Sequence, residues 1–282
     1  MRERDCGGSG VHWRAQEAGT LNRAIETARD VRIVPLDSKR VMVVSCDSAG
    51  GIGSKPLDRV RTSPFVVGKF TARVALMETL STGAEPVCIA SALAVEPKPT
   101  GDQILRGVRS EMKHALLGPN TPMVNSAEKN FKVQSTGVGV MAVGVGIRNR
   151  MRIGRCEVGD EILVVGSPHV GGDVLEAEKR GIITNSRDVR NLLGTNSVHE
   201  LIPAGSKGIL HEAKVLAADS HLFFRPEKNM KLDVTKSAGP ATAIVSSCAR
   251  GRLKRIASLT HKPVTRIGHL LLDQNHRSRM GT

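Results

Sequence analysis

The chain has 282 residues, of which 40% are hydrophobic, and a formal net charge of +14 with a pI near 10.1. This length is sufficient for two domains, and the composition is typical of a soluble globular protein. The positive charge predicts an anionic ligand, but only 2% of the residues are aromatic and Tyr is absent. Because proteins that bind single-stranded nucleic acid usually stack bases on aromatic side chains, we expect phosphorylated small molecules instead and consider nucleic acid an unlikely partner.

The five cysteines form no C-x-x-C pair, so the sequence favours neither a zinc ribbon nor thioredoxin-like chemistry. An odd, scattered set of cysteines without a secretory signal is typical of a reduced, cytoplasmic protein. No apolar run approaches the roughly 20 residues that cross a bilayer. We therefore expect a cytoplasmic protein with no membrane segment.

The first half of the chain predicts an alternation of strands and helices after a flexible segment over residues 1–30, in which Leu21–Asp30 can form a short helix. Pro64 introduces apolar residues at helical spacing that end before Gly83, a typical C′ residue. A second helix is expected after Thr100 and Asp102, which can cap it. Its apolar stripe consists of Ile104, Leu105, Val108, Met112 and Leu116. The expected strands are 31–35, 41–46, 87–95 and 138–147.

The basic, glycine-containing stretch 148–160 separates two strongly β-forming runs and is the expected domain junction. We therefore predict an N-terminal domain over 31–150 and a C-terminal domain over 151–282. The elements expected in the second half are strands over 161–166, 241–247 and 263–270, and helices over 173–180, 188–193 and 206–218. This order favours two mixed α+β halves over one doubly wound sheet.

The stretch "SCDSAGGIGSK" (45–55) follows an apolar run and resembles a phosphate loop, although it lacks the G-K-[ST] order of a Walker A motif. Its glycines tolerate the backbone conformations with which N–H groups converge on an oxyanion. Asp47 could hold Mg²⁺, as carboxylate oxygens do, and Lys55 could neutralise phosphate. The alternative is a strand and tight turn with Lys55 in solvent. The predicted phosphate-binding residues are Gly50, Gly51, Gly53, Ser54 and Lys55, together with Glu128 and Lys129 from "NSAEKN" (125–130).

Glu78 lies four residues after Val74, on or beside the apolar stripe of its helix. An unpaired carboxylate is costly to bury, so such a residue is normally paired or bound to metal. The alternatives are that Glu78 reaches water or pairs with Arg73 or Lys69. If it meets Asp47 in space, the two form a plausible Mg²⁺–nucleotide site.

A second group of candidates lies in "HELIPAGSKGILHEA" (199–213) and "KSAGPAT" (236–242). The Gly-Ser-Lys-Gly segment precedes a helical run, and a helix N-terminus can face an anion. His199 and His211 are candidate bases, although an isolated His is more often structural. The predicted substrate-binding residues are Gly205, Ser206, Lys207, His211, Ser237 and Gly239.

Three stretches carry a family resemblance: "SCDSAGGIGSK", "SPFVVGKFTARVALMETLSTGAEP" and "CEVGDEILVVGSP". Together they resemble the aminoimidazole ribonucleotide synthetase-like (PurM-like) superfamily over roughly residues 40 to 270. That group includes the purine cyclo-ligase, formylglycinamidine synthase, selenophosphate synthetase and thiamine-phosphate kinase. The segments "GSKGILHEA" and "KSAGPAT" resemble the α-ribazole kinase branch, which acts in cobalamin biosynthesis.

The resemblance implies an N-terminal α+β domain that pairs across a homodimer, its strands building a shared barrel. A C-terminal α/β domain would close over it, with ATP and Mg²⁺ between them. It also implies that Asp47 and Glu78 hold the metal and that Asp47 and Lys55 are catalytic. Relatives mostly have Asp at the position of Glu78. The side chain that would carry the metal-binding carboxylate is therefore one methylene longer in this sequence.

These observations lead to one main hypothesis, an ATP- and Mg²⁺-dependent kinase of a nucleoside-like alcohol such as α-ribazole. Phosphoryl transfer depends on positioning and charge neutralisation more than on a covalent protein group. The alternative in the same superfamily is a cyclo-ligase that activates an amide with ATP. The alternative of another class is a basic nucleic-acid-binding protein, which strong salt-dependent retention without nucleotide binding would favour.

Overall fold

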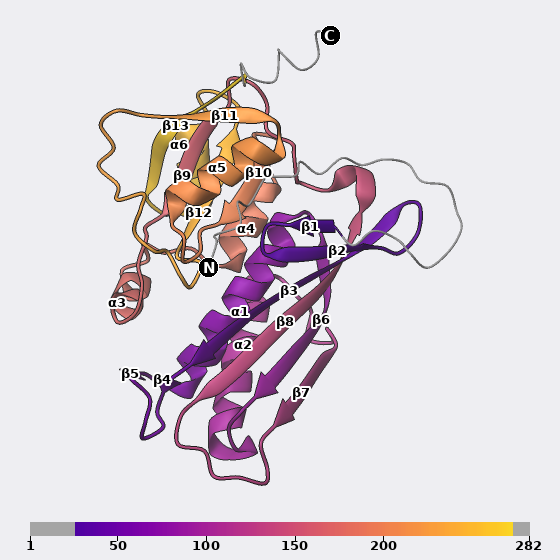
Figure 1. The fold of residues 1–282 in the computed structure, drawn as a ribbon, viewed down its shortest axis with the longest axis vertical. Helices are drawn as coiled ribbons and strands as arrows, with labels where there is room; N and C mark the ends of the chain where they lie inside the picture. Colours follow the sequence, from indigo (N-terminus) through magenta and orange to yellow (C-terminus); the bar gives the residue numbers. More distant parts are fainter. Residues whose placement is uncertain (1–25, 273–282) are drawn as a thin grey trace, which may run out of the picture.

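The computed structural model describes residues 26–272, which form two β-sheets and the helices packed on them (Figure 1). The mixed α+β class expected from the sequence is confirmed. No helix among residues 26–272 is long and apolar enough to cross a membrane.

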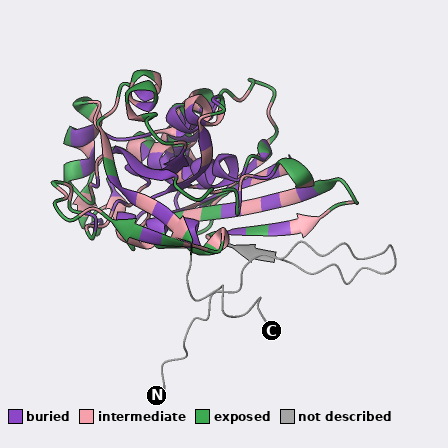
Figure 2. Cartoon of the chain, turned by 90° about the horizontal axis from the view of Figure 1, so that it is seen from above, coloured by how far each residue is buried: buried purple, intermediate pink, exposed green. Residues whose placement is uncertain are grey.

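The first sheet has six strands in the order β1-β2-β3-β8-β6-β7, antiparallel except for the β6–β7 pair. Burial alternates along its central strands, as expected for a sheet with one covered face (Figure 2). Its strands are β1 (Glu26–Ala28), β2 (Val31–Pro35), β3 (Arg40–Gly50), β6 (Glu85–Leu93), β7 (Met123–Ala127) and β8 (Gly137–Ile147). A separate short pair consists of β4 (Ile52–Gly53) and β5 (Val60–Arg61).

Helix α1 (Pro64–Ser81) lies along the covered face of this sheet (Figure 1). Ser63 caps it by accepting a hydrogen bond from the Val66 N–H, and Pro64 occupies its first turn. Gly83 follows with φ +83° and donates to the Leu80 carbonyl, so the predicted helix end is confirmed.

Helix α2 (Asp102–His114) crosses α1 at two glycines. A Cβ at Gly68 would lie 2.1 Å from the Ile104 carbonyl oxygen, and one at Gly107 would lie 2.0 Å from the Phe65 carbonyl oxygen. The two backbones therefore touch, which fixes the distance between α1 and α2.

The predicted caps of α2 are wrong, because its N-cap residue is Gly101 and makes no side-chain capping bond. Thr100 instead donates its hydroxyl to Glu96. Leu116 does not extend the apolar stripe, since it is 54% exposed with φ +60° just beyond the helix end.

The second sheet has the order β10-β12-β9-β13-β11, and its central strands are buried on both faces. Alternate residues of β9 pack toward α4 and α6 on one side and toward α5 on the other, which explains its continuous apolar run. Its strands are β9 (Glu161–Gly166), β10 (Val198–Pro203), β11 (Leu222–Pro226), β12 (Ala243–Cys248) and β13 (Val264–Leu272). The helices of this half are α3 (Asp173–Lys179), α4 (Ser186–Leu193), α5 (Ile209–Asp219) and α6 (Leu253–Thr260).

Two corrections concern the first half of the chain. The helix predicted over Leu21–Asp30 lies partly outside the described residues, and within them Glu26–Ala28 is a strand that pairs with β2. The strand predicted over 41–46 continues to Gly50, so the first part of "SCDSAGGIGSK" is strand and not loop.

The sequence also failed to indicate β1, β7, β10, β11 and α6. The division at 148–160 into two domains stays a prediction.

Candidate functional site

A cavity of about 1190 Å³ lies between the first sheet, α1 and loops of the C-terminal half. Strand β3 supplies Val44–Gly50 to its lining, and α1 supplies residues between Val66 and Glu78. The C-terminal half contributes three segments: Val170–Leu175, Ala204–Ser206 and Gly239–Ala241. The cavity therefore brings together Asp47, Glu78 and two of the segments that the sequence predicted to bind substrate.

The register of β3 explains why Asp47 faces α1. Ser45, two residues earlier on the same face, donates its hydroxyl to the Ala75 carbonyl at 2.6 Å and lies 2.7 Å from the Thr79 hydroxyl. Because side chains of a strand repeat their direction every second residue, Asp47 projects from the same face as Ser45. Glu78 is the neighbour of Thr79 on the helix.

Glu78 is only 6% exposed, and its Oε2 atom has no hydrogen-bond partner among residues 26–272. Burial and the nearby carboxylates of Asp30, Glu212 and Asp47 raise the pKa of this carboxyl to about 8, against the opposing effect of Arg29. Neither expected alternative partner is available. Arg73 pairs with Glu111 and Glu178, and Lys69 pairs with Glu178.

Asp47 shares this environment. Burial raises the pKa of its carboxyl to about 6, against the opposing effect of the Ser48 N–H. The pKa of Glu212, in the first turn of α5, is raised to about 7 by burial and by Asp30. The pKa values of three carboxyl groups from two halves of the chain are thus raised in one region, and groups with perturbed pKa values are typical of functional sites.

Asp30 is a cavity residue that the sequence analysis missed. It occupies the turn between β1 and β2 together with Arg29, whose φ is +57°. Arg29 lines the cavity as well, and its guanidinium reaches the C-terminal half.

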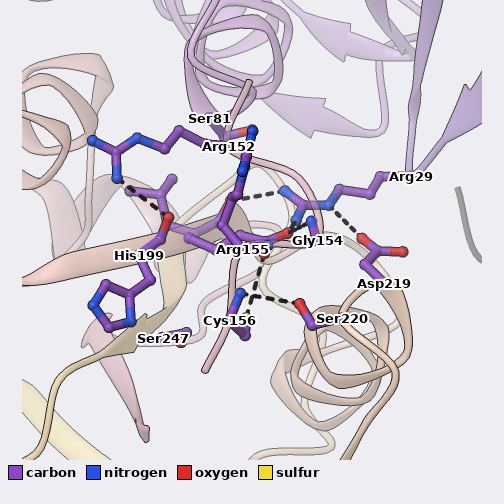
Figure 3. A network of polar contacts seen from close by, with 12 residues as sticks. Arg29, Ser81, Arg152, Gly154, Arg155, Cys156, His199, Asp219, Ser220 and Ser247 are labelled. Carbon is purple, nitrogen blue, oxygen red and sulfur yellow. Dashed lines mark hydrogen bonds and ion pairs between the residues drawn. The ribbon is translucent and has the colours of Figure 1, made fainter. Parts of the chain in front are cut away.

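Arg29 is buried in a polar network with that half (Figure 3). Its guanidinium pairs with Glu200, donates to Asp219 at 3.1 Å and donates to the Leu201 carbonyl at 2.9 Å. Glu200 also accepts the N–H groups of Gly154 and Arg155 at 3.1 and 2.6 Å. This network fixes the position of Asp30, because the neighbouring residue is anchored to the C-terminal half.

The glycine segment does not form the predicted anion nest. Gly50 is paired with Gly137 in the sheet, and the Gly51 N–H donates to the Thr136 carbonyl at 2.9 Å. Gly50 lines the cavity, whereas Gly51, Gly53, Ser54 and Lys55 are not among its lining residues. Gly53 is packed so closely that a Cβ would lie 2.4 Å from the Thr136 hydroxyl.

The Lys55 ammonium pairs with Glu96, and its backbone N–H donates to Asp58 at 2.7 Å. Besides Arg29, the cavity lining includes the cations Arg32 and Arg61, and both are exposed. Arg61 is oriented by the carbonyls of Lys55 and Pro56 at 2.6 and 2.9 Å. No sequence motif marks either arginine, because only the folded sheet brings them to the cavity.

The substrate-binding residues predicted in the C-terminal half divide into those that line the cavity and those that do not. Gly205, Ser206 and Gly239 line the cavity, and the Gly205 carbonyl accepts the Ala238 N–H at 3.1 Å, which holds the two segments together. Lys207, His211 and Ser237 do not line it. The pKa of His211 is lowered, by burial and by Lys207.

Glu128 and Lys129 also lie away from the cavity lining. The Glu128 carboxylate accepts the N–H groups of Asn130 and Phe131 at 2.6 and 3.1 Å, and these bonds lower its pKa. Glu128 thus closes a turn.

The Val-Gly-Asp segment (158–160) ends in a structural carboxylate. Asp160 is 3% exposed and accepts hydrogen bonds from the Glu157 N–H at 2.9 Å, from His199 at 2.8 Å and from Ser247. Glu157, Asp160 and His199 have ligand atoms close enough to share a metal, but the buried carboxylate already has its partners within the protein. His199, a candidate base, is engaged here and not at the cavity.

A known family matches the first part of the chain. Residues 28–144 match the family described as AIR synthase related protein, N-terminal domain. Comparison with curated proteins gave no sequence match.

Solved structures share the fold. PurL of Thermotoga maritima complexed with ATP has a TM-score of 0.60 at 15% identity, over 88% of this chain and 44% of PurL. Thiamine-monophosphate kinase of Stenotrophomonas maltophilia has a TM-score of 0.54 at 19% identity, over 90% of each chain. A ThiL structure complexed with AMPPCP and TMP has a TM-score of 0.59 at 15% identity, over 86% of this chain and 85% of ThiL. The chain spans less than half the length of PurL, and at these identities the likeness shows a PurM-like fold.

Proposed function

We propose that the protein is an ATP- and Mg²⁺-dependent phosphotransferase. The observation that carries the proposal is the buried Glu78 carboxyl, whose Oε2 lacks a partner within residues 26–272 and which lies in the same cavity as Asp47. The fold is shared with enzymes whose structures contain ATP or AMPPCP.

The residues present fit a divalent cation. Asp30, Asp47 and Glu78 offer oxygen ligands, the type that Mg²⁺ prefers, and the raised pKa values of Asp47 and Glu78 are those of carboxyls that lack a counter-charge. When bound, the ion would neutralise phosphate charge. We assign its ligands to these three residues, which adds Asp30 to the pair predicted from the sequence.

We assign the phosphate contacts to Arg61 and Arg32 and not to Lys55, because both arginines line the cavity while the Lys55 ammonium is paired with Glu96. Charge-assisted hydrogen bonds from guanidinium groups suit phosphate oxygens. The Gly205–Ser206 and Gly239 segments shape the acceptor side. The backbone is open at Gly205, where a Cβ would meet nothing within 4 Å.

The acceptor we propose is a nucleoside-like alcohol, with α-ribazole as the first compound to test. Two kinase structures of this fold cover most of the chain, which supports phosphoryl transfer to a small molecule. The PurL match supports a second candidate, ATP-dependent activation of an amide oxygen.

We propose further that the protein is a homodimer that pairs through the outer face of the first sheet. No helix within residues 26–272 covers that face, and it exposes Val87 by 41%, Met141 by 41% and Val124 by 60%. Exposed apolar patches of this kind mark interaction sites. Light scattering should give twice the chain mass for the wild type and the chain mass for Met141→Lys.

The deciding experiment measures ADP release from Mg²⁺–ATP with α-ribazole, other nucleosides or formylglycinamidine ribonucleotide. Stimulation by a nucleoside supports the kinase, and stimulation by the amide supports the ligase. If no acceptor raises turnover and ATP gives no thermal shift, the proposal fails. Salt-dependent retention on DNA or RNA without nucleotide binding would instead support a nucleic-acid-binding protein.

Asp47→Asn tests the metal assignment separately. The substitution keeps size and hydrogen bonding but removes the charge, so we expect at least about a 100-fold loss of turnover. Full activity in this variant would remove Asp47 from the metal site even if the enzyme is a kinase.

A further inference from the structure

Helices α2, α4 and α6 form a joined surface that extends over both halves of the chain. Helix α4 contacts both other helices and lies between them in Figure 1. Its Arg190 side chain donates to the Ala115 carbonyl, just after α2, at 2.9 Å. The Asn191 amide of α4 donates to the Leu259 carbonyl of α6, also at 2.9 Å. These bonds hold the three helices in a fixed arrangement.

The acidic side chains of these helices contribute little negative charge to this surface. Glu111 is fully buried, and Asp188 is 3% exposed. Asp102 is the one exposed acid within α2, α4 and α6, and it lies at the end of α2 opposite the bonds to α4. Glu85, beside α4, is paired with Arg190 through both of its oxygens at 2.6 Å. The exposed charge of the surface is therefore mainly positive.

The cations of this surface are exposed and lack partners. We define the basic face as eight cations whose side chains make no hydrogen bond or ion pair within residues 26–272 and do not line the cavity. They are Arg106, Arg109 and Lys113 of α2, Arg187 of α4, and Arg250, Arg252, Lys254 and Arg255 at the start of α6. The stretch 249–272 contains no Asp or Glu. Uncompensated positive charge of this kind attracts anions.

The dimensions of the basic face suit a polymer of phosphates better than a small anion. The 13 residues of α2 extend about 20 Å at a rise of about 1.5 Å per residue. Two successive helix contacts of about 8–10 Å each give a similar width. Double-stranded DNA carries about 12 phosphate charges over 20 Å of its axis. A duplex therefore places several phosphates against the face at once, whereas a small anion uses only one or two cations.

The composition of the basic face distinguishes phosphates from other anionic partners. None of the exposed large hydrophobic side chains within residues 26–272 lies in α2, α4 or α6. A helix that binds a membrane surface inserts apolar side chains into the lipid, and a protein interface has an apolar core. The three helices also contain no Phe, Tyr or Trp, so the bases of a single strand would have no ring to stack on. The phosphates of a duplex need neither feature.

The uncharged polar side chains of the face favour DNA over RNA. Asn191 is bonded to the Leu259 carbonyl, and Ser258 donates its hydroxyl to the Arg255 carbonyl at 2.8 Å. Recognition of duplex RNA uses contacts with 2′-hydroxyl groups, and these two side chains are engaged within the protein. Sequence-independent binding of DNA needs only cations that neutralise phosphates.

We propose that the basic face binds double-stranded DNA through its phosphates, without sequence preference and separately from the cavity. The scarcity of aromatic side chains argues against base stacking but not against this mode of binding. Because none of the eight cations lines the cavity, the inference does not depend on the proposed function, and DNA and nucleotide can bind at the same time.

Fluorescence anisotropy of a labelled 20-base-pair duplex with the full chain tests the proposal. If about five of the eight cations contact phosphates, the logarithm of the association constant falls with the logarithm of salt concentration with a slope of about −4.5. We therefore expect about 500-fold weaker binding at 200 mM than at 50 mM salt. Duplexes of unrelated sequence should bind within threefold of one another, and a single strand at least tenfold more weakly.

Matched pairs of substitutions locate the binding on the basic face. Arg106→Ala combined with Arg109→Ala removes two phosphate contacts and should reduce the steepness of the salt dependence by about 2. Lys254→Ala combined with Arg255→Ala should do the same from the other half of the chain. Lys228→Ala combined with Lys231→Ala removes the same charge from exposed positions outside the three helices, and it should leave binding within twofold of the wild type. All of these variants should keep the ADP release of the wild type.

Several results would overturn the inference. One is the absence of DNA binding at 50 mM salt, and another is an equal loss in the control pair, which would mean that net charge alone attracts the DNA. Tighter binding to duplex RNA, or to vesicles of phosphatidylserine and phosphatidylcholine, would assign the face to a different partner. Displacement of DNA by Mg²⁺–ATP would place the DNA at the cavity and not on the basic face.

Discussion

Two buried glutamates on adjacent helices differ in one respect, the presence of partners. Glu111 of α2 is fully buried, and its carboxylate accepts hydrogen bonds from Arg73 at 3.3 Å and from the N–H and hydroxyl of Ser186 at 2.9 and 2.7 Å. Glu78 of α1 is nearly as buried and has an oxygen without a partner among residues 26–272. A paired buried carboxylate connects helices, whereas an unpaired one that lines a cavity marks a place for a ligand.

The largest expected effect on stability comes from substituting Glu111, the glutamate that has partners. Glu111→Gln removes one of the two carboxylates that compensate the buried Arg73 charge and weakens the connection of α1 and α2 to α4. We expect the free energy of unfolding to fall by about 3 kcal/mol, as for other buried ion pairs that lose one partner. Urea unfolding monitored by circular dichroism measures this change.

Glu176→Gln is the matched control for Glu111→Gln. Glu176 is exposed and pairs with Lys179 at 3.7 Å on the surface of α3. Its substitution should change the free energy of unfolding by less than about 0.5 kcal/mol. If the two variants are equally stable, the Arg73 network does not stabilise the fold.

Substitution of Glu78, the glutamate with an unpaired oxygen, should lower activity and raise stability. Glu78→Gln should lower turnover at least about 100-fold, because a ligand of the cation is lost. At pH 8 without Mg²⁺ it should also raise the free energy of unfolding by about 1–3 kcal/mol, since a neutral amide replaces a buried carboxyl that is partly ionised at this pH. A variant that is inactive and also less stable would mean that Glu78 is structural.

The pH dependence of stability provides a third measurement. The pKa of Glu78 is raised to about 8, so between its ordinary value near 4.5 and pH 8 the folded state holds a proton that the unfolded state has released. The contribution of Glu78 to stability therefore falls as the pH rises through this range and is constant above it.

We expect the difference in unfolding free energy between the wild type and Glu78→Gln to grow by a few kcal/mol from pH 5 to pH 8. Asp47, with a pKa raised to about 6, contributes in the same direction at lower pH. Mg²⁺ binds the ionised carboxylates, so adding it at pH 8 should remove most of the difference. A difference independent of pH and of Mg²⁺ would contradict the cation site.

The smallest predicted effect is on ATP affinity, and it distinguishes two cations near β3, Arg61 and Lys55. Arg61→Ala should weaken ATP binding about tenfold, because it removes a charge-assisted bond at the cavity. Lys55→Ala should weaken it less than about twofold, because its ammonium is paired with Glu96 away from the cavity lining. Fluorescent nucleotide titration measures both, and the reverse order would restore Lys55 as the phosphate ligand.

The predictions from sequence succeeded where local chemistry decides the structure. Pro64 at the start and Gly83 after the end define α1, and the apolar runs over 87–95 and 161–166 are strands because burial favours them on one or both faces. The spacing placed Glu78 on or beside the apolar stripe of its helix, and the structure buries it. Its relation to Asp47 needed the structure, which places both in the lining of one cavity.

The predictions from sequence failed where contacts with residues far away in the sequence determine the structure. The end of β3 was predicted to be a loop, but Ser48 and Gly50 pair with Gly139 and Gly137 of β8, so the backbone of a remote strand imposes the extended conformation. Lys55 read as a phosphate ligand because its partner Glu96 lies 41 positions away. Arg29 could not be identified, because its partner Glu200 is 171 positions away.

The close packing of α1 on α2 at Gly68 and Gly107 has a consequence for how this protein can diverge. Because the two backbones touch at both glycines, any side chain at either position would force the helices apart. Gly171 and Gly172, which line the cavity, have open space where a Cβ would stand, with no atom beyond their chain neighbours within 4 Å. Changes of acceptor should therefore accumulate in the segment that includes α3, while the packing of α1 on α2 stays constant.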